Sequence, residues 1–541
     1  TLAVLPFDSL SAGLDNANLA IAIRNDLLAN LTKISALRVI SRPSNSVYQN
    51  DQQNSTEIGN DLDSTVILEG SVQRSGNTVR INVQLIDANT AEHLWAEIYQ
   101  RELTVENVFG LQSEMAASIA SALEATLLPD ELDRLNVVPT LNARAYEFYL
   151  TGIDYLSRLD HRQFTPLAVQ QLQRAVAEDS AFAQAWAELA RARLRLVFFD
   201  LGEDEAQLPL AQQAVEQALT LAPDAGEPYL ALAWYHYMGE QDFSAALEAL
   251  AVAEERLPGS AEVLLTKAYV HRREGNWEQE LANIEQAMDL DPQNFSLVHE
   301  SFSVNGRLRN YEKAQADLER LLEFAPDNAR YRQVEAMFSM QRDGDFAALK
   351  AAAASLEPLA DRAFLGWQAA LYERDYELAI RYLDVWKFEA PELEGRPWER
   401  QSMYGIAYTL AGRPDLGTAE FLNARAQIED ALNAASDDAE LHVDLGEVLA
   451  WTGEREAAER LALRAIDLAQ SGDALHARRV QGNAIIRVLG PAGARASTVE
   501  MLDEHLQQGP WSIEGLLPDP RLDPVRDDAG FRALVSRHRR Q

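Results

Sequence analysis

Residues 227–260 read EPYLALAWYHYMGEQDFSAALEALAVAEERLPGS, and residues 261–294 read AEVLLTKAYVHRREGNWEQELANIEQAMDLDPQN. Each stretch predicts two amphipathic helices joined by a short polar turn. Prolines recur around them at intervals of 35, 34 and 34 residues, at Pro223, Pro258, Pro292 and Pro326. Proline is tolerated where one helix has ended and the next has yet to begin. A period of about 34 residues is typical of stacked helix–turn–helix units.

Equivalent positions of the repeat units carry similar residues. The repeat therefore has a phase, meaning a defined starting position, as well as a period. Counted from Glu227, Ala261 and Phe295, position 17 is aromatic in all three units and positions 24 and 27 are apolar. Position 17 is predicted to open the second helix of each unit, at Phe243, Trp277 and Tyr311. Weaker copies of the unit are found at 145–180, 360–391 and 441–470. Neighbouring helical hairpins are therefore expected to interlock at fixed positions along most of the chain.

The first 130 residues have a different character. Short apolar runs with period-two alternation predict strands near 1–7, 37–41, 65–73, 78–85 and 93–100, with helices at 16–33 and 105–127. The predicted organisation is an α/β domain at 1–130, a linker at 131–141, a helical solenoid at 142–470, and a helical cap and tail at 471–541. The expected fold class is α+β overall, a small mixed α/β domain followed by an all-α, right-handed solenoid.

Composition excludes several classes of function. The chain has 48 Lys and Arg against 84 Asp and Glu, a net charge of −36, so direct nucleic-acid binding is not expected. It has no cysteine, which removes disulfides, thiolate metal sites and cysteine nucleophiles. No apolar run reaches the length of about 18 residues that a membrane span needs. The chain starts inside an apparent strand, so we expect the natural polypeptide to begin upstream of Thr1, and any membrane attachment to come from there.

Two sets of motifs resemble a known family. The runs Leu2–Phe7, Val66–Val72 and His93–Glu97 resemble the TolB-amino-terminal-like domain of bacterial regulators, which precedes tetratricopeptide repeats in that family. The tail from Asp519 to Arg526 resembles the usual ending of such proteins. The resemblance implies an accessory sensing or interaction region of the kind that follows a winged-helix DNA-binding domain, a nucleotide cyclase or a protein kinase. None of those output domains is recognisable in this sequence.

Motifs of catalysis are missing from the sequence. It has no phosphate-binding G-x-x-x-x-G-K-[ST], no H-E-x-x-H and no G-x-S-x-G. The nine histidines are scattered without metal-ligand spacing. We therefore expect no catalytic residues, no metal and no cofactor.

The first helix of each hairpin lines the inner groove in this type of repeat, and the phase therefore selects candidate residues for binding a partner. They are Tyr235, Tyr269, Arg272, Arg273, His299 and Arg307. Arginine forks bind carboxylates in bidentate fashion, so an acidic segment or a free C-terminus of a protein or peptide is the expected partner. The alternative is that these arginines pair with the chain's own Glu274, Glu278 or Glu300, since most charge clusters are solvated surfaces.

Two functions are expected from these observations. The first is a non-enzymatic protein-interaction or sensing region of a larger bacterial regulatory or signalling protein. The second is a periplasmic scaffold subunit of an envelope complex. A periplasmic location is compatible with the absence of cysteine and with the acidic surface, with a cytoplasmic one as the alternative. Self-association is compatible with both.

Overall fold

The structure is a computed structural model that describes residues 1–10, 14–41, 64–76, 78–102, 105–135, 137–156, 158, 161–198, 204–292, 294–324, 329–355, 359–385, 396–470, 473–508 and 512–539. The chain divides into two compact units. The first consists of Thr1–His271 and Glu278–Val298, and the second of Arg272–Trp277 and His299–Gln541. Each unit is described by itself below.

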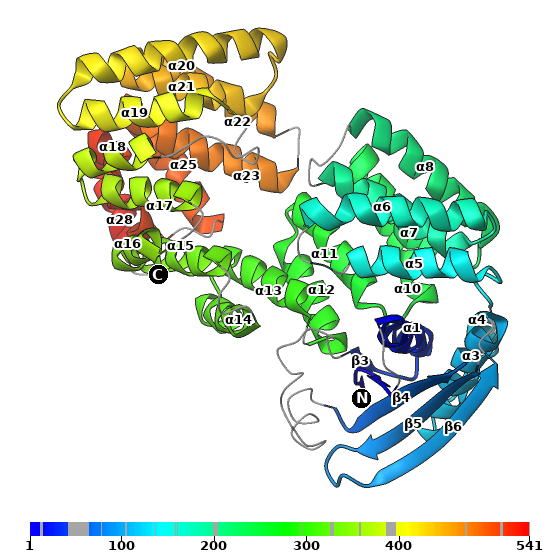
Figure 1. Cartoon of the computed structure of the whole chain (residues 1–541). Coiled ribbons are helices and arrows are strands. Elements are labelled where there is room, and N and C mark those ends of the chain that lie inside the picture. Colours follow the sequence, from blue (N-terminus) through cyan, green and yellow to red (C-terminus); the bar gives the residue numbers. More distant parts are fainter. Residues whose placement is uncertain are drawn as a thin grey trace. The chain divides into compact units, whose positions relative to one another are not determined.

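The first unit begins with a six-stranded sheet (Figure 1). The strand order is β3-β1-β4-β5-β6, and a short strand, β2, also pairs with β4. The strands are β1 (Leu2–Val4), β2 (Asp8–Ser9), β3 (Val39–Ser41), β4 (Val66–Ser75), β5 (Thr78–Asp87) and β6 (His93–Glu102). Strand β1 is parallel to β3 and β4, whereas β4, β5 and β6 form an antiparallel meander.

Two helices cover one face of this sheet, α1 (Leu14–Leu31) and α3 (Val105–Ala122). Alternate strand residues such as Ile81, Val83 and Leu85 point at them and are buried, which is the period-two pattern of a sheet with one covered face. The turn between β5 and β6 is held by Asp87, whose Oδ1 accepts hydrogen bonds from the amides of Asn89 and Thr90 at 2.8 and 2.9 Å. A short helix, α4 (Pro129–Leu135), follows α3.

Helical hairpins make up the rest of the first unit. We call the first helix of each hairpin the A helix and the second the B helix. The pairs are α5 (Ala143–Leu156) with α6 (His161–Glu178), α7 (Ala183–Phe198) with α8 (Asp204–Leu221), and α9 (Glu227–Tyr235) with α10 (Phe243–Arg256). Helix α9 continues through a π-helical turn, η1 (His236–Glu240). Helices α11 (Ala261–Glu274), α12 (Trp277–Leu290) and α13 (Phe295–Arg307) contribute residues to both units.

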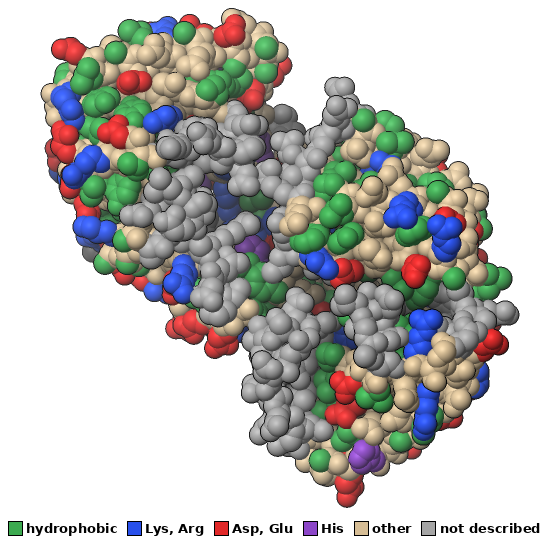
Figure 2. Space-filling model, in the orientation of Figure 1, with side chains coloured by type: hydrophobic (Ala, Val, Ile, Leu, Met, Phe, Trp, Pro, Cys, Tyr) green, Lys and Arg blue, Asp and Glu red, His purple; other side chains and the backbone are tan. Residues whose placement is uncertain are grey.

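The second unit continues the alternation of A and B helices. Its hairpins are α15 (Ala329–Asp343) with α16 (Phe346–Ser355), α17 (Leu359–Tyr372) with α18 (Tyr376–Val385), α19 (Trp398–Leu410) with α20 (Pro414–Ala434), and α21 (Ala439–Trp451) with α22 (Arg455–Ala469), all preceded by α14 (Tyr311–Phe324). The remaining elements are α23 (Ala474–Asn483), the π-helical turn η3 (Ala484–Leu489), α24 (Gly490–Ala492), α25 (Arg495–Gln508), α26 (Ile513–Leu516), the 3₁₀ turn η4 (Pro520–Leu522), α27 (Asp523–Arg526) and α28 (Ala529–His538). On the face drawn in Figure 2, charged side chains of both signs are scattered among apolar ones over this unit.

The fold class predicted from the sequence is confirmed, and so is the phase of the repeat. The second helices begin at Phe243, Trp277 and Tyr311, the positions that the aromatic register predicts. Pro223, Pro258 and Pro292 lie in the turns before the next A helix, whereas Pro326 lies outside the described residues. Helix α4 overlaps the first residues of the segment 131–141 that the sequence predicts as a linker. Glu131 of that helix is buried and accepts a hydrogen bond from the Ser35 amide at 2.9 Å, which ties the segment to the α/β domain.

The two helices of a hairpin approach each other closely where a small residue faces a large one. A Cβ placed on Gly405 of α19 would lie 2.6 Å from the Phe421 ring of α20, well inside van der Waals contact. Phe421 is fully buried in the core of the second unit. The absence of a side chain at Gly405 is therefore what allows this helix pair to close.

We predict that Gly405→Ala destabilises the protein by about 1–3 kcal/mol, because overpacking forces the Phe421 ring or a helix to move. The matched control is Gly306→Ala in α13, where no atom lies within 4 Å of the added Cβ. That change should stabilise the protein by about 0.4–1 kcal/mol. Urea unfolding followed by circular dichroism measures both, and equal effects of the two substitutions would contradict the steric explanation.

Candidate functional site

The residues selected by the repeat phase lie on A helices, but they do not form one group. Tyr235 and Tyr269 belong to the first unit, whereas Arg272, Arg273, His299 and Arg307 belong to the second. Tyr269 is half-buried and packs edge-on against Trp234, with ring centroids 6.1 Å apart. Burial raises the pKa of Tyr235, with Glu240 and Glu216 adding to the effect. Both tyrosines present part of an aromatic surface on the first unit.

Two of the predicted arginines pair with acidic residues of their own chain. Arg272 contacts Glu300 at 2.8 Å, and little of either side chain is exposed. Glu300 is one of the three acids named in the surface-pair alternative. Arg273 contacts Asp473 at 2.8 Å, a pair that joins positions 200 residues apart. These arginines thus contribute to the internal structure of the second unit.

A second group of basic side chains surrounds Trp277. The guanidinium carbons of Arg307 and Arg478 lie 5.1 and 4.9 Å from the centroid of its ring, within the range of cation–π interaction. Burial lowers the pKa of Arg478, the positive charge of Arg307 lowers it further, and the negative charge of Glu504 opposes both effects. Trp277 itself is 9% exposed, and both arginines are half-buried. The ring therefore holds two like charges near each other.

His505 of α25 lies close to Arg478 and to Arg309. Its side chain is buried, and a Cβ on Gly482 would lie 3.0 Å from its ring. Burial, together with Arg478 and Arg309, lowers the pKa of His505 to about 4, so the imidazole is neutral at physiological pH. We call Trp277, Arg307, Arg309, Arg478 and His505 the Trp277 cluster. Of the predicted residues, Arg307 belongs to it, and His299 packs instead edge-on against Tyr331, 6.0 Å between centroids.

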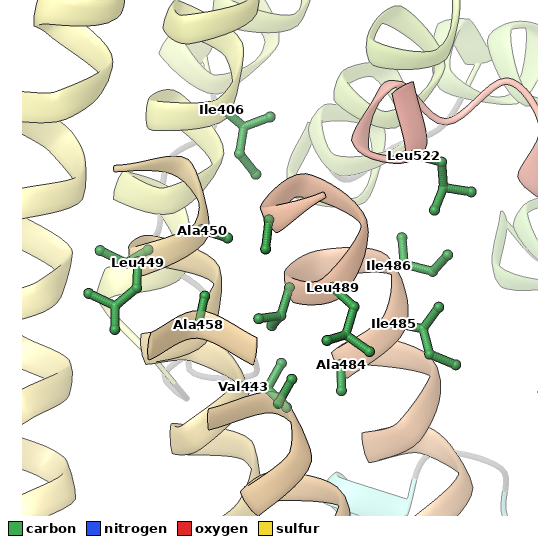
Figure 3. Packing of buried hydrophobic residues seen from close by; sticks show 14 of the residues in the cluster. Ile406, Val443, Leu449, Ala450, Ala458, Ala484, Ile485, Ile486, Leu489 and Leu522 are labelled. Carbon is green, nitrogen blue, oxygen red and sulfur yellow. The ribbon is translucent and has the colours of Figure 1, made fainter. Parts of the chain in front are cut away.

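The A helices of the second unit also carry the C-terminal end of the chain. The Ser512 amide and hydroxyl both donate to the carbonyl of Gln341 at the end of α15, at 3.1 and 2.7 Å. Arg374, after α17, forms a bidentate pair with Asp523, at 2.5 and 2.9 Å. Leu522 is fully buried in the core of the unit and lies across from Ile486 of η3 (Figure 3). The segment Ser512–Arg526 thus packs against helices of its own unit, much as a bound peptide would.

A buried ionic network lies within the same core. Asp444 and Glu447 of α21 are 1% and 3% exposed and accept hydrogen bonds from Arg487 of η3 at 2.9 and 2.7 Å. Asp444 also accepts from Arg396 and from the Trp398 indole, both at 2.9 Å. Burial would lower the pKa of Arg487, but Glu447 and Asp444 hold it above its usual value. Since both carboxylates are satisfied by cations, the network ties α19, α21 and η3 together.

The sequence patterns did not predict this ionic network, nor the place where the C-terminal segment packs. Asp444 and Glu447 stand at spacing three inside the otherwise apolar run from Leu441 to Ala450, a pattern that signals buried charge. Their partner Arg487 is about 40 residues away, which no local spacing reveals.

The residues that the structure describes include neither a candidate metal site nor a candidate membrane span. Among them, no group of three or more His, Asp or Glu is placed to hold a metal ion. Within the same residues, no helix combines the length and the apolar character required to cross a bilayer.

Comparisons with known proteins give partial matches. No family model matches the chain. A protein of Rhizobium meliloti (strain 1021) described as putative adenylate cyclase 3 is 34% identical over 194 residues, 35% of this chain and 32% of that protein. A rice (Oryza sativa subsp. japonica) SGT1 homologue is 30% identical over 99 residues, 18% of this chain and 26% of the other. The chain thus spans about a third or less of the length of these curated relatives.

Among solved structures, a thermophilic tetratricopeptide-repeat protein of Thermus thermophilus is similar to part of the chain. It is 19% identical with a TM-score of 0.31, covering 36% of this chain and 97% of that one.

Truncation of Leu522, whose side chain holds the C-terminal segment in the core, should lower the stability of the second unit. We predict that Leu522→Ala lowers stability by about 2–5 kcal/mol, because it leaves a cavity among buried aliphatic side chains. Leu422→Ala on α20 is the control, since that leucine is 55% exposed. Urea unfolding should show a change for Leu522 alone, and an unchanged midpoint in Leu522→Ala would mean that the C-terminal segment does not pack as described.

The neutral, buried His505 makes stability depend on pH. Its pKa falls from 6.5 to about 4 on folding, so the unfolded chain binds more protons between these values. Stability should therefore fall as the pH drops from about 6.5 towards 4. Between pH 7 and pH 5 we expect the wild type to lose ~2 kcal/mol more than His505→Gln. Parallel urea titrations at the two pH values test this, and identical losses in both proteins would refute it.

Proposed function

We propose that this chain is a non-enzymatic protein-interaction region of a larger bacterial regulatory or signalling protein. The proposal is supported by the architecture, an α/β domain followed by helical hairpins, and by the partial match to a protein described as a putative adenylate cyclase. We further propose that residues 1–130 are a TolB-amino-terminal-like domain, on the strength of the motifs in its strands. The hairpins present surfaces to a partner and carry out no chemistry.

The observation that carries the proposal is the charge of the Trp277 cluster. The chain has a net charge of −36, yet here two guanidinium groups share one aromatic ring and a third, that of Arg309, lies near the same buried histidine. These arginines also have partners within the chain, since the negative charge of Glu504 acts on Arg478 and Arg309 donates to the Leu506 carbonyl. A partner's carboxylate would compete with these groups and add to the balance of the positive charge. An acidic segment or a free C-terminus of a partner protein is the ligand that this chemistry favours.

The six candidates from the repeat phase take different parts in this proposal. Arg307 supplies charge directly as a member of the Trp277 cluster. Arg272 and Arg273 are paired with Glu300 and Asp473, so a partner's carboxylates would have to compete with these acids. We propose that His299 borders the same surface on α13. On the first unit, Tyr235 and Tyr269 would contact apolar side chains of a partner.

The alternative function is that of a periplasmic scaffold subunit. It would use the same surfaces of the chain and would differ only in the assembly and compartment in which the chain works. It stays a prediction, as does the periplasmic location.

The test removes the positive charge of two arginines and leaves a polar side chain of similar size at each position. We expect Arg307→Gln with Arg478→Gln to weaken binding of a fluorescent acidic decapeptide with a free C-terminus at least tenfold, measured by anisotropy. The matched control is Arg455→Gln with Arg460→Gln, two exposed arginines of α22 in the same unit. Charge reversal of Arg272 and Arg273 would be less informative, because it also breaks two ion pairs.

Equal affinity of the double variant and the wild type would place peptide binding elsewhere. Equal losses in the double variant and its control would mean that the effect is general electrostatic attraction. Failure of the wild type to bind any acidic peptide would remove the proposed ligand class.

A further inference from the structure

Strand β6 is the free edge of the sheet in the first unit. It ends the strand order, and among the described residues no strand pairs with its outer side (Figure 1). It is 10 residues long, HLWAEIYQRE, without proline or lysine. Proteins usually protect such edges with those residues, with bulges or inward-pointing charges, with very short strands or with a covering element, because unpaired amides and carbonyls recruit other strands. Strand β6 has a bulge at Leu94 and an inward Glu97, but from Trp95 to Glu102 its pairing is regular.

Side chains on the face of β6 that points towards α3 are fixed by contacts within the domain. Tyr99 is buried in the core and donates its hydroxyl hydrogen to Glu97 at 2.9 Å. Arg101 pairs with Glu114 of α3 at 3.1 Å. Beneath the edge, a hollow is lined by Trp95 and Glu97 of β6 and by small side chains of α3, namely Ala117, Ser118, Ser121 and Ala122. Side chains of an added strand that point towards α3 would enter this hollow.

The outer face of β6 carries apolar side chains in water. Leu94 is 51% and Ile98 is 54% exposed, and the exposed Ala96 stands between them. Ala96 and Ile98 share a face of the regular part of the strand, whereas Leu94 lies at a bulge, where the pairing with β5 shifts register between Leu85 and Ile86. Their neighbours on β5 are polar, with Ala96 opposite Gln84 and Ile98 opposite Asn82. An apolar row at the margin of a polar sheet face gains burial only if another apolar strand is added beside it.

We propose that β6 pairs in antiparallel fashion with β6 of a second copy of this chain, with Ala96 opposite Ala96 across the two-fold axis. From Trp95 onwards, where the strand is regular, opposite residues have positions that sum to 192, and Ile98 of each copy lies opposite the bulged Leu94 of the other. Ala96 and Ile98 of both copies then gather on the outer face, next to the two Leu94 side chains. Trp95 faces Glu97, and Gln100 faces Glu92, so no like charges stand directly opposite each other.

Neighbouring registers are worse, which is why a second copy is preferred to an unrelated strand. Centring the pair on Glu97 places two carboxylates opposite each other, centring it on Ile98 places Leu94 opposite Glu102, and centring it on Trp95 places Ile98 opposite Glu92. The strand is thus self-complementary in one register, as a two-fold interface requires. Two chains of net charge −36 also repel at long range, so this dimer should be weak and should strengthen as salt screens the repulsion. The proposal does not depend on the partner-binding function of the hairpins.

The absence of cysteine allows a direct test of the register. A disulfide requires Cα atoms within about 7 Å. Ala96→Cys should give a disulfide-linked dimer under mild oxidation, because the two Cys would face each other across the axis. Gln100→Cys is the matched control on the same strand and face. Its two Cys would stand eight positions apart, roughly 27 Å along the strands, and should stay unlinked.

Sedimentation velocity gives the second measurement. The wild type should dimerise in a concentration-dependent manner, more strongly at 500 mM than at 50 mM NaCl. Leu94→Lys with Ile98→Lys should weaken dimerisation at least tenfold. Leu416→Lys with Leu422→Lys on α20, which are 49% and 55% exposed, should leave it unchanged.

Three results would overturn the proposal. They are a wild type that stays monomeric at all concentrations and salt levels, equal cross-linking at positions 96 and 100, and a dimer that survives the Leu94 and Ile98 substitutions.

Discussion

The close crossing of the two helices in each hairpin is the constraint on which the helical part of this protein depends. A helix pair can pack this tightly only where a small residue on the A helix faces a large one on the B helix. Gly405 against Phe421 satisfies it in the second unit, and Gly152 against Leu172 satisfies it in the first. A third contact of this kind, Gly366 of α17 against Tyr382 of α18, lies in the second unit. In these hairpins the contact distinguishes the A helix, which carries the small residue, from the B helix, which carries the large one.

This distinction explains how charge is distributed in the second unit. The A helices carry the C-terminal segment, held by Leu522 and by the Arg374–Asp523 pair. They also carry Asp444, whose buried charge is balanced by Arg487 and Arg396. Much of the A-helix surface is therefore used inside the unit. Under the proposed function, a partner would bind beside the C-terminal segment, at the Trp277 cluster.

Sequence patterns predicted local structure, but they did not predict contacts between residues that are far apart in the chain. The aromatic residues that open the B helices could be placed to the residue, because the helical period and the repeat phase are properties of neighbouring positions. The pairing of Arg273 with Asp473 could not, because those residues are brought together only by the stacking of the hairpins between them. The phase selected Arg307 for the candidate site, but Arg478 lies outside the clean repeats and was missed. Strand order likewise decides that β6 is an edge, and one strand pattern does not reveal its neighbours.

Hydrogen–deuterium exchange of the intact chain tests most directly whether the second unit is completed by its own C-terminal segment. The amides of Leu517 and Leu522 donate to Ile513 and Asp519, and the side chains around them are buried. We predict that amides of residues 513–526 exchange as slowly as those of α21, since both belong to one core. Exchange of this segment on the timescale of an exposed loop, with α21 still protected, would contradict it.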